Sequence, residues 1–264
     1  MDLSTRFVVG WLALLFLLSW AISMDGLFQA HFWDKQHAYE MLTSVQPEDI
    51  FFNSTALPAD VASSYFTERR YFIMLPHVIG AIIWWNLYFV QLLPKVRHQY
   101  PLVHRCLGRM LMLAAISQAI SGIGMAATSH SSTIKIVSYM YGVSILYCIY
   151  HAWKFAYVRD IPKHKFWASR LVGYLQGIAL QRFWMVLLIG SYHAGWRGLY
   201  ASIDGQSQKV VDEFIYQIFD DSFVGAVLQA LLFTEWYLSL HSVQKLQLSL
   251  ASSHDESTSA KKVV

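Results

Sequence analysis

The amino-acid sequence predicts an all-α protein, a polytopic transmembrane helix bundle with six spans. Of its 264 residues 55% are hydrophobic and only 14% are charged, against about 25% charged residues in an ordinary soluble domain. The apolar residues also fall in separate runs of about 20, the length of helix that crosses the ~30 Å hydrocarbon core of a bilayer. Because the 20 Lys and Arg nearly balance the 17 Asp and Glu, the basic footprint of a nucleic-acid-binding protein is missing and we expect no nucleic-acid partner.

The first hydrophobic segment has two interpretations. Residues 1–30 form a transmembrane span or signal anchor, although Ala21-Ile22-Ser23 also fits the cleavage site of a signal peptide. Cleavage would leave the topology of the remaining chain unchanged. The expected spans, in chain order, are residues 7–24, 72–94, 107–127, 134–154, 171–191 and 222–243. They divide the chain into the first span (1–30), a lumenal loop (31–71), a four-span membrane core (72–191), a second lumenal loop (192–221), the last span (222–244) and a cytosolic tail (245–264).

The distribution of basic residues predicts that both termini are cytosolic. Thirteen of the 20 Lys and Arg then lie on the cytosolic side, six lie on the opposite side, and Arg182 lies within a span. Asn53 begins an Asn-Ser-Thr glycosylation sequon in the first lumenal loop, so we expect a glycan there. Lys261 and Lys262 near the C-terminus resemble the dilysine signal read by coat-type retrieval machinery. We therefore expect a multi-pass glycoprotein of the endoplasmic reticulum membrane.

The two expected cytosolic loops resemble each other. In each, a Pro precedes a His next to a basic residue, and an Arg follows: the residues are Pro101, His104, Arg105 and Arg109 in the first loop, and Pro162, His164, Lys165 and Arg170 in the second. This spacing predicts a duplicated hairpin, residues 72–127 and 134–191. Two helix N-termini at one membrane face, each with cationic side chains, would attract an anion. The alternative is that these residues only orient the protein in the membrane, which does not explain the histidines.

Polar residues also lie within the expected spans. A charge at the bilayer centre costs ~2.5–3.5 kcal/mol, so we expect Arg182 and Glu235 to pair across the fifth and sixth spans. Gln118 and Gln176 fall in the same layer and either line a polar cavity or join helices by hydrogen bonds. His77 lies just after Pro76 in the second span and is either a structural residue or a ligand or proton-transfer group.

These landmarks together resemble the bacterial and fungal membrane family catalogued as domain of unknown function 2306. The similarity covers about residues 72–190 and rests on Leu75-Pro76-His77-Val78-Ile79-Gly80, Gln91, Pro94, Arg97, Pro101, His104-Arg105, Gly108-Arg109, His164-Lys165-Phe166-Trp167 and Arg170. It implies a compact multi-span helical domain and no particular activity. Carried over by position, the residues of interest are His77, Gln91, Arg97, His104, Arg105, Arg109, His164, Trp167, Arg170 and Arg182. The chain departs from the pattern at Ala168-Ser169, where a Met-Ile pair is expected before the Arg.

Three functions are compatible with the sequence. The first is binding of, or action on, an amphipathic anionic ligand at the cytosolic His/Arg cluster, in contact with membrane lipids. Its catalytic candidates are His77, His104 and His164, and its ligand-binding candidates are Arg97, Arg105, Arg109, Arg170, Gln118, Gln176, Arg182 and Glu235. The second is a redox protein that holds haem through His151 and His241, which lie near cytosolic helix ends. The third is a structural membrane protein without chemistry. Two cysteines exclude a disulfide scaffold or a Cys-rich zinc site, and no Walker, HExxH, GxSxG or GxGxxG motif is present.

Overall fold

The computed structural model describes Gly10, Leu17 and residues 68–127, 129, 131–193 and 208–260, and every structural statement below concerns these residues. For some of them, among them Arg182 and residues 241–260, only the backbone is described. The described chain is helical apart from short connections, as the sequence predicts. The helices from residue 68 onward are α4 (Glu68–Leu92), α5 (Pro94–Gln99), α6 (Pro101–Ala126), α7 (Ser132–Tyr157), α8 (Ile161–Leu175), α9 (Gly177–His193) and α10 (Gln208–Ala260).

Four stretches of helix in the described chain are long and apolar enough to cross a membrane. They are Tyr71–Leu92, Pro101–Ala126, Ser132–Tyr157 and Tyr216–Leu240, and they correspond to the second, third, fourth and sixth expected spans. The protein therefore has the architecture of an integral multi-pass membrane protein. The first expected span lies outside the described residues except for Gly10 and Leu17.

The fifth expected span, residues 171–191, is not one helix. α8 ends at Leu175 and α9 begins at Gly177, so Gln176 stands at a break between two helices of 15 and 17 residues. α8 also begins ten residues before the expected span, because the basic segment that opens it is already helical. Similarly, α6 begins at Pro101 rather than at residue 107. A hydropathy boundary marks where side chains become polar, and Lys, Arg and Gln are compatible with a continuing helix.

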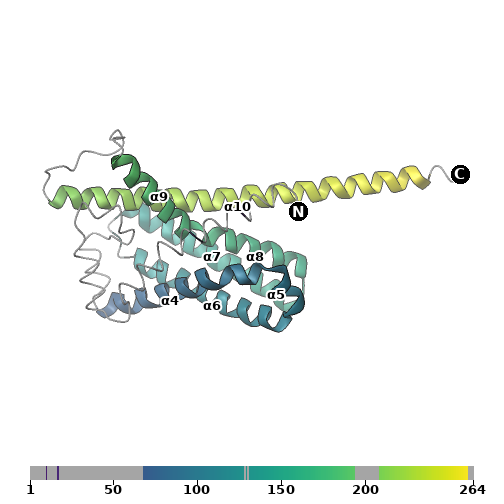
Figure 1. Ribbon diagram of the computed structural model, residues 1–264, viewed down its shortest axis with the longest axis horizontal. Coiled ribbons are helices and arrows are strands. Elements are labelled where there is room, and N and C mark those ends of the chain that lie inside the picture. Colours follow the sequence, from purple (N-terminus) through teal and green to yellow (C-terminus); the bar gives the residue numbers. More distant parts are fainter. Residues whose placement is uncertain are drawn as a thin grey trace.

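The sixth expected span forms the middle of a much longer helix. α10 has 53 residues, about 80 Å of helical rise. It begins in the segment expected to be a lumenal loop and continues into the segment expected to be a cytosolic tail. Figure 1 shows it running past the other helices on the side where α5 lies.

Proline and capping residues set the starts of α5, α6 and α8, which all lie at one end of the bundle. Pro94 and Pro101 stand in the first turns of α5 and α6, where the absent N–H has no helical partner to lose. The side chain of Asp160 accepts a hydrogen bond from the backbone N–H of Lys163 and so caps α8. The Lys163 side chain and backbone, hydrogen-bonded to this carboxyl group, hold the pKa of Asp160 below its ordinary value.

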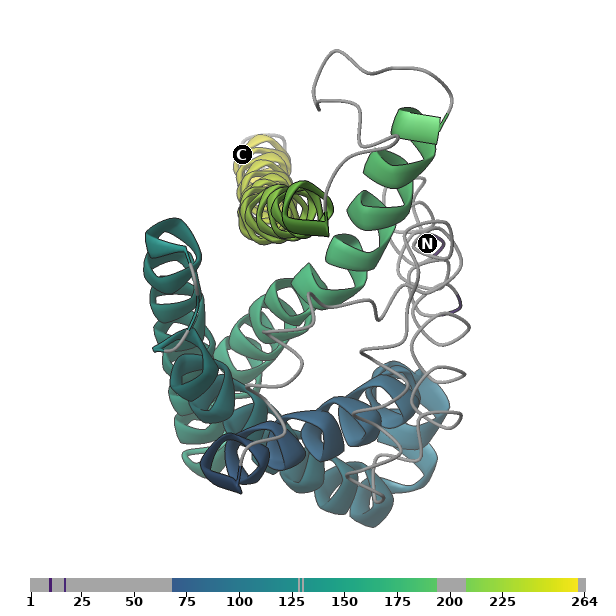
Figure 2. The same cartoon turned by 90° about the vertical axis from the view of Figure 1, so that its left-hand side faces the viewer.

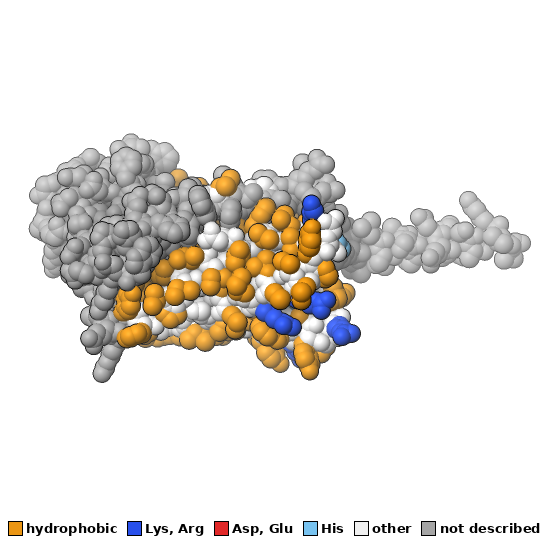
Figure 3. All heavy atoms as spheres, turned by 60° about the horizontal axis from the view of Figure 1, so that its bottom comes forward, with side chains coloured by type: hydrophobic (Ala, Val, Ile, Leu, Met, Phe, Trp, Pro, Cys, Tyr) orange, Lys and Arg blue, Asp and Glu red, His pale blue; other side chains and the backbone are white. Residues whose placement is uncertain are grey.

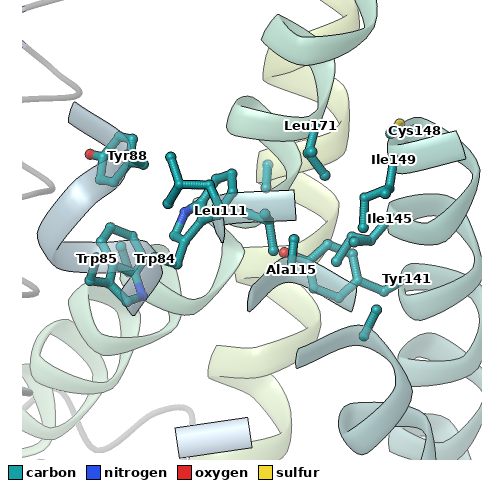
Figure 4. Close-up of a cluster of buried hydrophobic side chains, with 14 of the residues drawn as sticks. Trp84, Trp85, Tyr88, Leu111, Ala115, Tyr141, Ile145, Cys148, Ile149 and Leu171 are labelled. Atoms are coloured by element: carbon teal, nitrogen blue, oxygen red, sulfur yellow. The ribbon is translucent and has the colours of Figure 1, made fainter. Parts of the chain in front are cut away.

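Each helix from α4 to α10 packs against neighbouring helices. α4 lies along α6, α6 contacts α7, α7 lies along α8, and α9 and α10 lie side by side (Figure 2). At Gly80 the backbones of α4 and α6 come close, since an added Cβ would lie 2.8 Å from the carbonyl oxygen of Ala114. The apolar core joins these helices (Figure 4) and includes Trp84, Trp85, Tyr88, Leu111, Ala115, Tyr141, Ile145, Cys148, Ile149 and Leu171.

The two hairpins that resemble each other in sequence differ in how they continue. In the first, α6 packs along α4. In the second, α8 packs along α7, but beyond the break at Gln176 the chain turns away as α9 and packs on α10 (Figure 2). The two hairpins share their helix starts, where both α6 and α8 carry proline in the first turn, and they differ beyond Gln176.

Candidate functional site

Basic side chains gather where α4 and α7 end and α6 and α8 begin. Figure 3 shows Lys and Arg at one end of a face that is otherwise largely hydrophobic. We call this region the basic end; its exposed members are Lys95, Arg97, Arg105, Arg109, Lys154, Arg159, Lys163 and Lys165. The N-termini of α6 and α8 lie in this region, so the positive ends of both helix dipoles add to the cationic side chains.

The structure brings the two repeated histidines together at the basic end. His104 on α6 lies within electrostatic range of His164 on α8 and of Arg97 on α5. Its Nδ1 atom is buried and has no hydrogen-bond partner in the described part of the chain. The Nδ1 atom of His164 lies 2.8 Å from the carbonyl oxygen of Ala152. Because a carbonyl only accepts, Nδ1 of His164 carries the hydrogen, and a neutral ring keeps its lone pair on Nε2.

Neighbouring residues fix the shape of this region. The Nε of Arg105 donates to the carbonyl oxygen of Pro101 in its own helix at 3.3 Å. Gln91 near the end of α4 lies over Gly108, where an added Cβ would be 2.8 Å from the Gln91 Nε2. The Oε1 atom of Gln91 is buried without a partner among the described residues. A side chain larger than glycine at position 108 would displace Gln91 from its place beside the start of α6.

Glu235 on α10 has two described partners, and both lie on α8. Its Oε2 accepts from the Nη2 of Arg170 at 2.7 Å, and its Oε1 accepts from the hydroxyl of Tyr174 at 2.8 Å. The predicted partner, Arg182, lies in α9, and its side chain is outside those that the structure describes. Arg170 is nine residues from the start of α8, about 13 Å of helical rise, and Glu235 lies within the candidate span Tyr216–Leu240. α8 packs against α10, and this packing places Arg170 beside Glu235.

Aromatic rings surround the guanidinium group of Arg170. Its Cζ lies 4.6 Å from the ring centroid of Phe166 and 4.6 Å from that of Trp167, which is the range of cation–π attraction. The ring of Trp167 is in turn stacked on His151, with centroids 4.4 Å apart. The Nε of Arg170 is buried and has no acceptor among the described residues.

A tyrosine hydroxyl fills the break between α8 and α9. Tyr141 on α7 donates a hydrogen bond to the carbonyl oxygen of Tyr174, and its hydroxyl lies against Gly177. Gly177 has room for this contact because it lacks a side chain, since an added Cβ would lie 2.6 Å from the Tyr141 hydroxyl. The inserted hydroxyl replaces backbone hydrogen bonds of a continuous helix, and this accounts for the division of the fifth expected span.

Gln118 and Gln176 occupy separate places in the structure. The amide nitrogen of each donates to a carbonyl of its own helix, Ala114 for Gln118 and Val172 for Gln176, and each Oε1 is left buried without a described partner. Gln176 lies beside the Tyr88 hydroxyl at the α8–α9 break, whereas Gln118 lies against Gly80. Their contacts indicate two separate buried acceptors.

His77 is anchored to α6 through one ring nitrogen. Its Nδ1 lies 3.2 Å from the carbonyl oxygen of Gln118 and 3.1 Å from the hydroxyl of Ser121. The Ser121 hydroxyl donates to the carbonyl oxygen of Ser117. The Nδ1 of His77 therefore donates, and the contact joins α4 and α6 next to the hydrogen bond from Ser117 to the carbonyl oxygen of Pro76. His77 lies apart from the basic end, toward the beginning of α4.

Of the two proposed haem ligands, the structure describes the side chain of His151. The ring of His151 is stacked between aromatic groups, with Trp167 at 4.4 Å and Phe155 at 5.8 Å, while the side chain of His241 lies outside those described. In the described chain, no group of three or more His, Cys, Asp or Glu residues is placed to hold a metal ion. Cys106 and Cys148 are both free, the first exposed and the second buried.

The remaining sequence-based sites, Asn53, Lys261 and Lys262, lie outside the described residues. Hydropathy and the repeated loop motif do not reveal Tyr141, Tyr174 and Gly177, which form the helix break. The Gly173-x-x-x-Gly177 spacing, typical of close helix packing in membranes, is the signal that points to this place. No family model, curated protein or solved structure matches the chain, so the resemblance to domain of unknown function 2306 stays a prediction.

Proposed function

We propose that this multi-pass membrane protein binds an amphipathic anion, with the anionic headgroup held at the basic end. The observation that carries the proposal is the position of His104. Its buried Nδ1 has no described partner, and the ring stands within electrostatic range of Arg97 and His164. Orientation in a membrane relies on Lys and Arg and gains nothing from an imidazole with a buried, unpartnered nitrogen beside an arginine, whereas an anion accepts hydrogen bonds from both kinds of side chain.

The chemistry of the basic end suits a phosphate-type headgroup. Arg97, Arg105 and Arg109 are exposed there, and the N–H groups of two helix starts add donors and positive dipole ends. An apolar tail would find hydrophobic surface next to them, because Tyr100, Leu102 and Val103 are all more than half exposed. If the protein also transforms the ligand, His104 and His164 are the groups able to act as acid or base.

Binding can be measured with one lipid pair that differs in charge. Oleoyl lysophosphatidate is titrated into the purified full chain in detergent, with oleoyl lysophosphatidylcholine as the zwitterionic control. We expect lysophosphatidate to bind more tightly and to raise the melting temperature. Arg97→Gln combined with His104→Gln should weaken binding roughly tenfold or more, since each charge-assisted contact contributes ~1.5–3 kcal/mol.

A matched variant separates local recognition from overall charge. Lys135→Gln removes a cation from the start of α7, at the opposite end of the bundle, and should leave the affinity unchanged. Equal binding of both lipids, or an unchanged affinity in the Arg97/His104 variant, would favour the structural role without a ligand.

We further propose residence in the endoplasmic reticulum with both termini cytosolic. The support is the excess of Lys and Arg on one side, the sequon at Asn53 and the pair Lys261-Lys262. Replacing both lysines by Ser should move the protein to later compartments of the secretory pathway, as seen by acquisition of complex glycans at Asn53. An unchanged distribution would show that the pair is not a retrieval signal.

A further inference from the structure

We propose that the edge of the Arg170 guanidinium group formed by Nε and Nη2 is an oxyanion site within the bundle. Glu235 is an internal carboxylate that an entering oxyanion displaces from this edge. The inference rests on the proposed function, because it concerns the same class of ligand at a second, deeper position. It differs in the residues involved, since Arg170 and Glu235 are not part of the cluster around His104.

The first argument is that Arg170 uses only one of the two N–H donors on this edge. In arginine the Nε and Nη2 hydrogens point the same way and together hold both oxygens of a carboxylate or phosphate. Here Glu235 accepts from Nη2 alone at 2.7 Å, while Nε is buried without an acceptor among the described residues. A buried donor on a charged group that lacks a partner is costly. An oxyanion that accepted from both Nε and Nη2 would remove that cost.

The second argument is that the guanidinium group is held in place without Glu235. Phe166 and Trp167 each lie 4.6 Å from its Cζ, and both belong to α8, the helix that carries Arg170. A cation fixed by its own helix stays oriented when its counterion leaves, so the site is preorganised for another anion.

The third argument is that the Glu235 carboxylate can move away from Arg170. Its side chain is 43% exposed, against 19% for Arg170, so the carboxylate lies at the edge of the contact and the cation lies inside. Oε1 is already bonded to the Tyr174 hydroxyl, and this bond can remain when Oε2 leaves Nη2. Glu235 therefore acts as a tethered competitor: it neutralises Arg170 when no ligand is bound and opposes any anion that approaches.

The test compares lysophosphatidate binding to the full-length wild type and to Glu235→Gln, which keeps the shape of the side chain and removes its charge. We expect the variant to bind about tenfold more tightly, since a competing carboxylate beside the cation is gone. Arg170→Lys together with Glu235→Gln should lose this gain, because an ammonium group cannot hold two oxygens side-on. Glu213→Gln removes another carboxylate from α10, about 33 Å of helical rise away, and should behave as the wild type.

The outcomes separate this inference from the proposed function. If the wild type binds lysophosphatidate and Glu235→Gln binds it with equal or lower affinity, Glu235 is not a competitor and the inference is wrong. If the wild type does not bind but Glu235→Gln does, the inference holds and the cluster around His104 is not a ligand site. If Glu235→Gln does not fold, Glu235→Asp keeps the charge on a shorter arm and should give a smaller gain, and no gain would overturn the inference. Inorganic phosphate, added as a competitor, shows whether the headgroup alone is recognised.

Discussion

At the scale of single residues, one hydroxyl group decides the course of the chain between α8 and α9. Tyr141 donates to the carbonyl oxygen of Tyr174 and its hydroxyl lies against Gly177, so a backbone carbonyl at the helix break is satisfied by a side chain from α7. In an apolar environment such a carbonyl cannot be left unpaired. The break is therefore stabilised by the same contact that joins α7 to α8.

We predict that Tyr141→Phe destabilises the protein by ~1–3 kcal/mol, because it leaves a buried carbonyl without its donor. Gly177→Ala should also be destabilising, since the new Cβ would lie 2.6 Å from the Tyr141 hydroxyl. The double variant lacks the hydroxyl oxygen that would clash with the new Cβ, so its loss of stability should be smaller than the sum of the two single losses. Thermal unfolding of the purified proteins gives the three values.

Tyr139→Phe is the control for this series, because Tyr139 is an exposed residue of the same helix and its change should have little effect. Strict additivity of Tyr141→Phe and Gly177→Ala would mean that the two residues do not share a contact.

At the scale of elements, the short turn between α7 and α8 contains both the C-terminal cap of α7 and the N-terminal cap of α8. The N–H of Asp160 bonds the carbonyl oxygen of Phe155, and the N–H of Arg159 bonds that of Ala156, the paired bonds of a Schellman motif. Arg159 has φ of 59°, the left-handed conformation that glycine adopts most easily. Asp160 then caps α8 directly. The short turn keeps the two helices antiparallel and presents His164 to the basic end.

We predict that Arg159→Gly raises the stability of the protein by ~0.5–1 kcal/mol, because an L-residue in the left-handed region is strained by its Cβ. The measurement is the shift of the unfolding transition of the purified protein. Arg159→Ala is the matched control: it removes the same charge but keeps the Cβ, so it should not be stabilising. Equal stabilisation by Gly and Ala would show that relief of charge repulsion at the basic end, rather than backbone strain, is the cause.

At the scale of the whole molecule, charge and apolar surface are separated along the bundle axis. The basic end carries the exposed Lys and Arg of four helices and their connections, and the adjoining face is largely hydrophobic (Figure 3). Such a distribution fits a bundle whose basic end meets the cytosolic membrane surface, where lysine and arginine are enriched.

We predict that the basic end is cytosolic, and single-cysteine variants can test this. In a background with Cys106→Ser and Cys148→Ser, His98→Cys on α5 should react with a membrane-impermeant maleimide on intact, cytosol-side-out vesicles. Ser132→Cys, exposed at the start of α7, should react only after the vesicles are opened. The reverse pattern would invert the orientation, and reaction of both on intact vesicles would contradict the transmembrane arrangement of α6 and α7.

The sequence by itself determined the all-α class and four of the expected spans, because the length and hydropathy of a spanning helix follow directly from bilayer thickness. It also indicated the two basic helix starts, since Pro, His and Arg at repeated spacing are visible in the chain. Only the tertiary structure decided the partner of Glu235, the break at Gln176 and the length of α10. The first two depend on which side chain of another helix reaches a given place, as Tyr141 does at Gly177, and hydropathy along one chain carries no information about that distance.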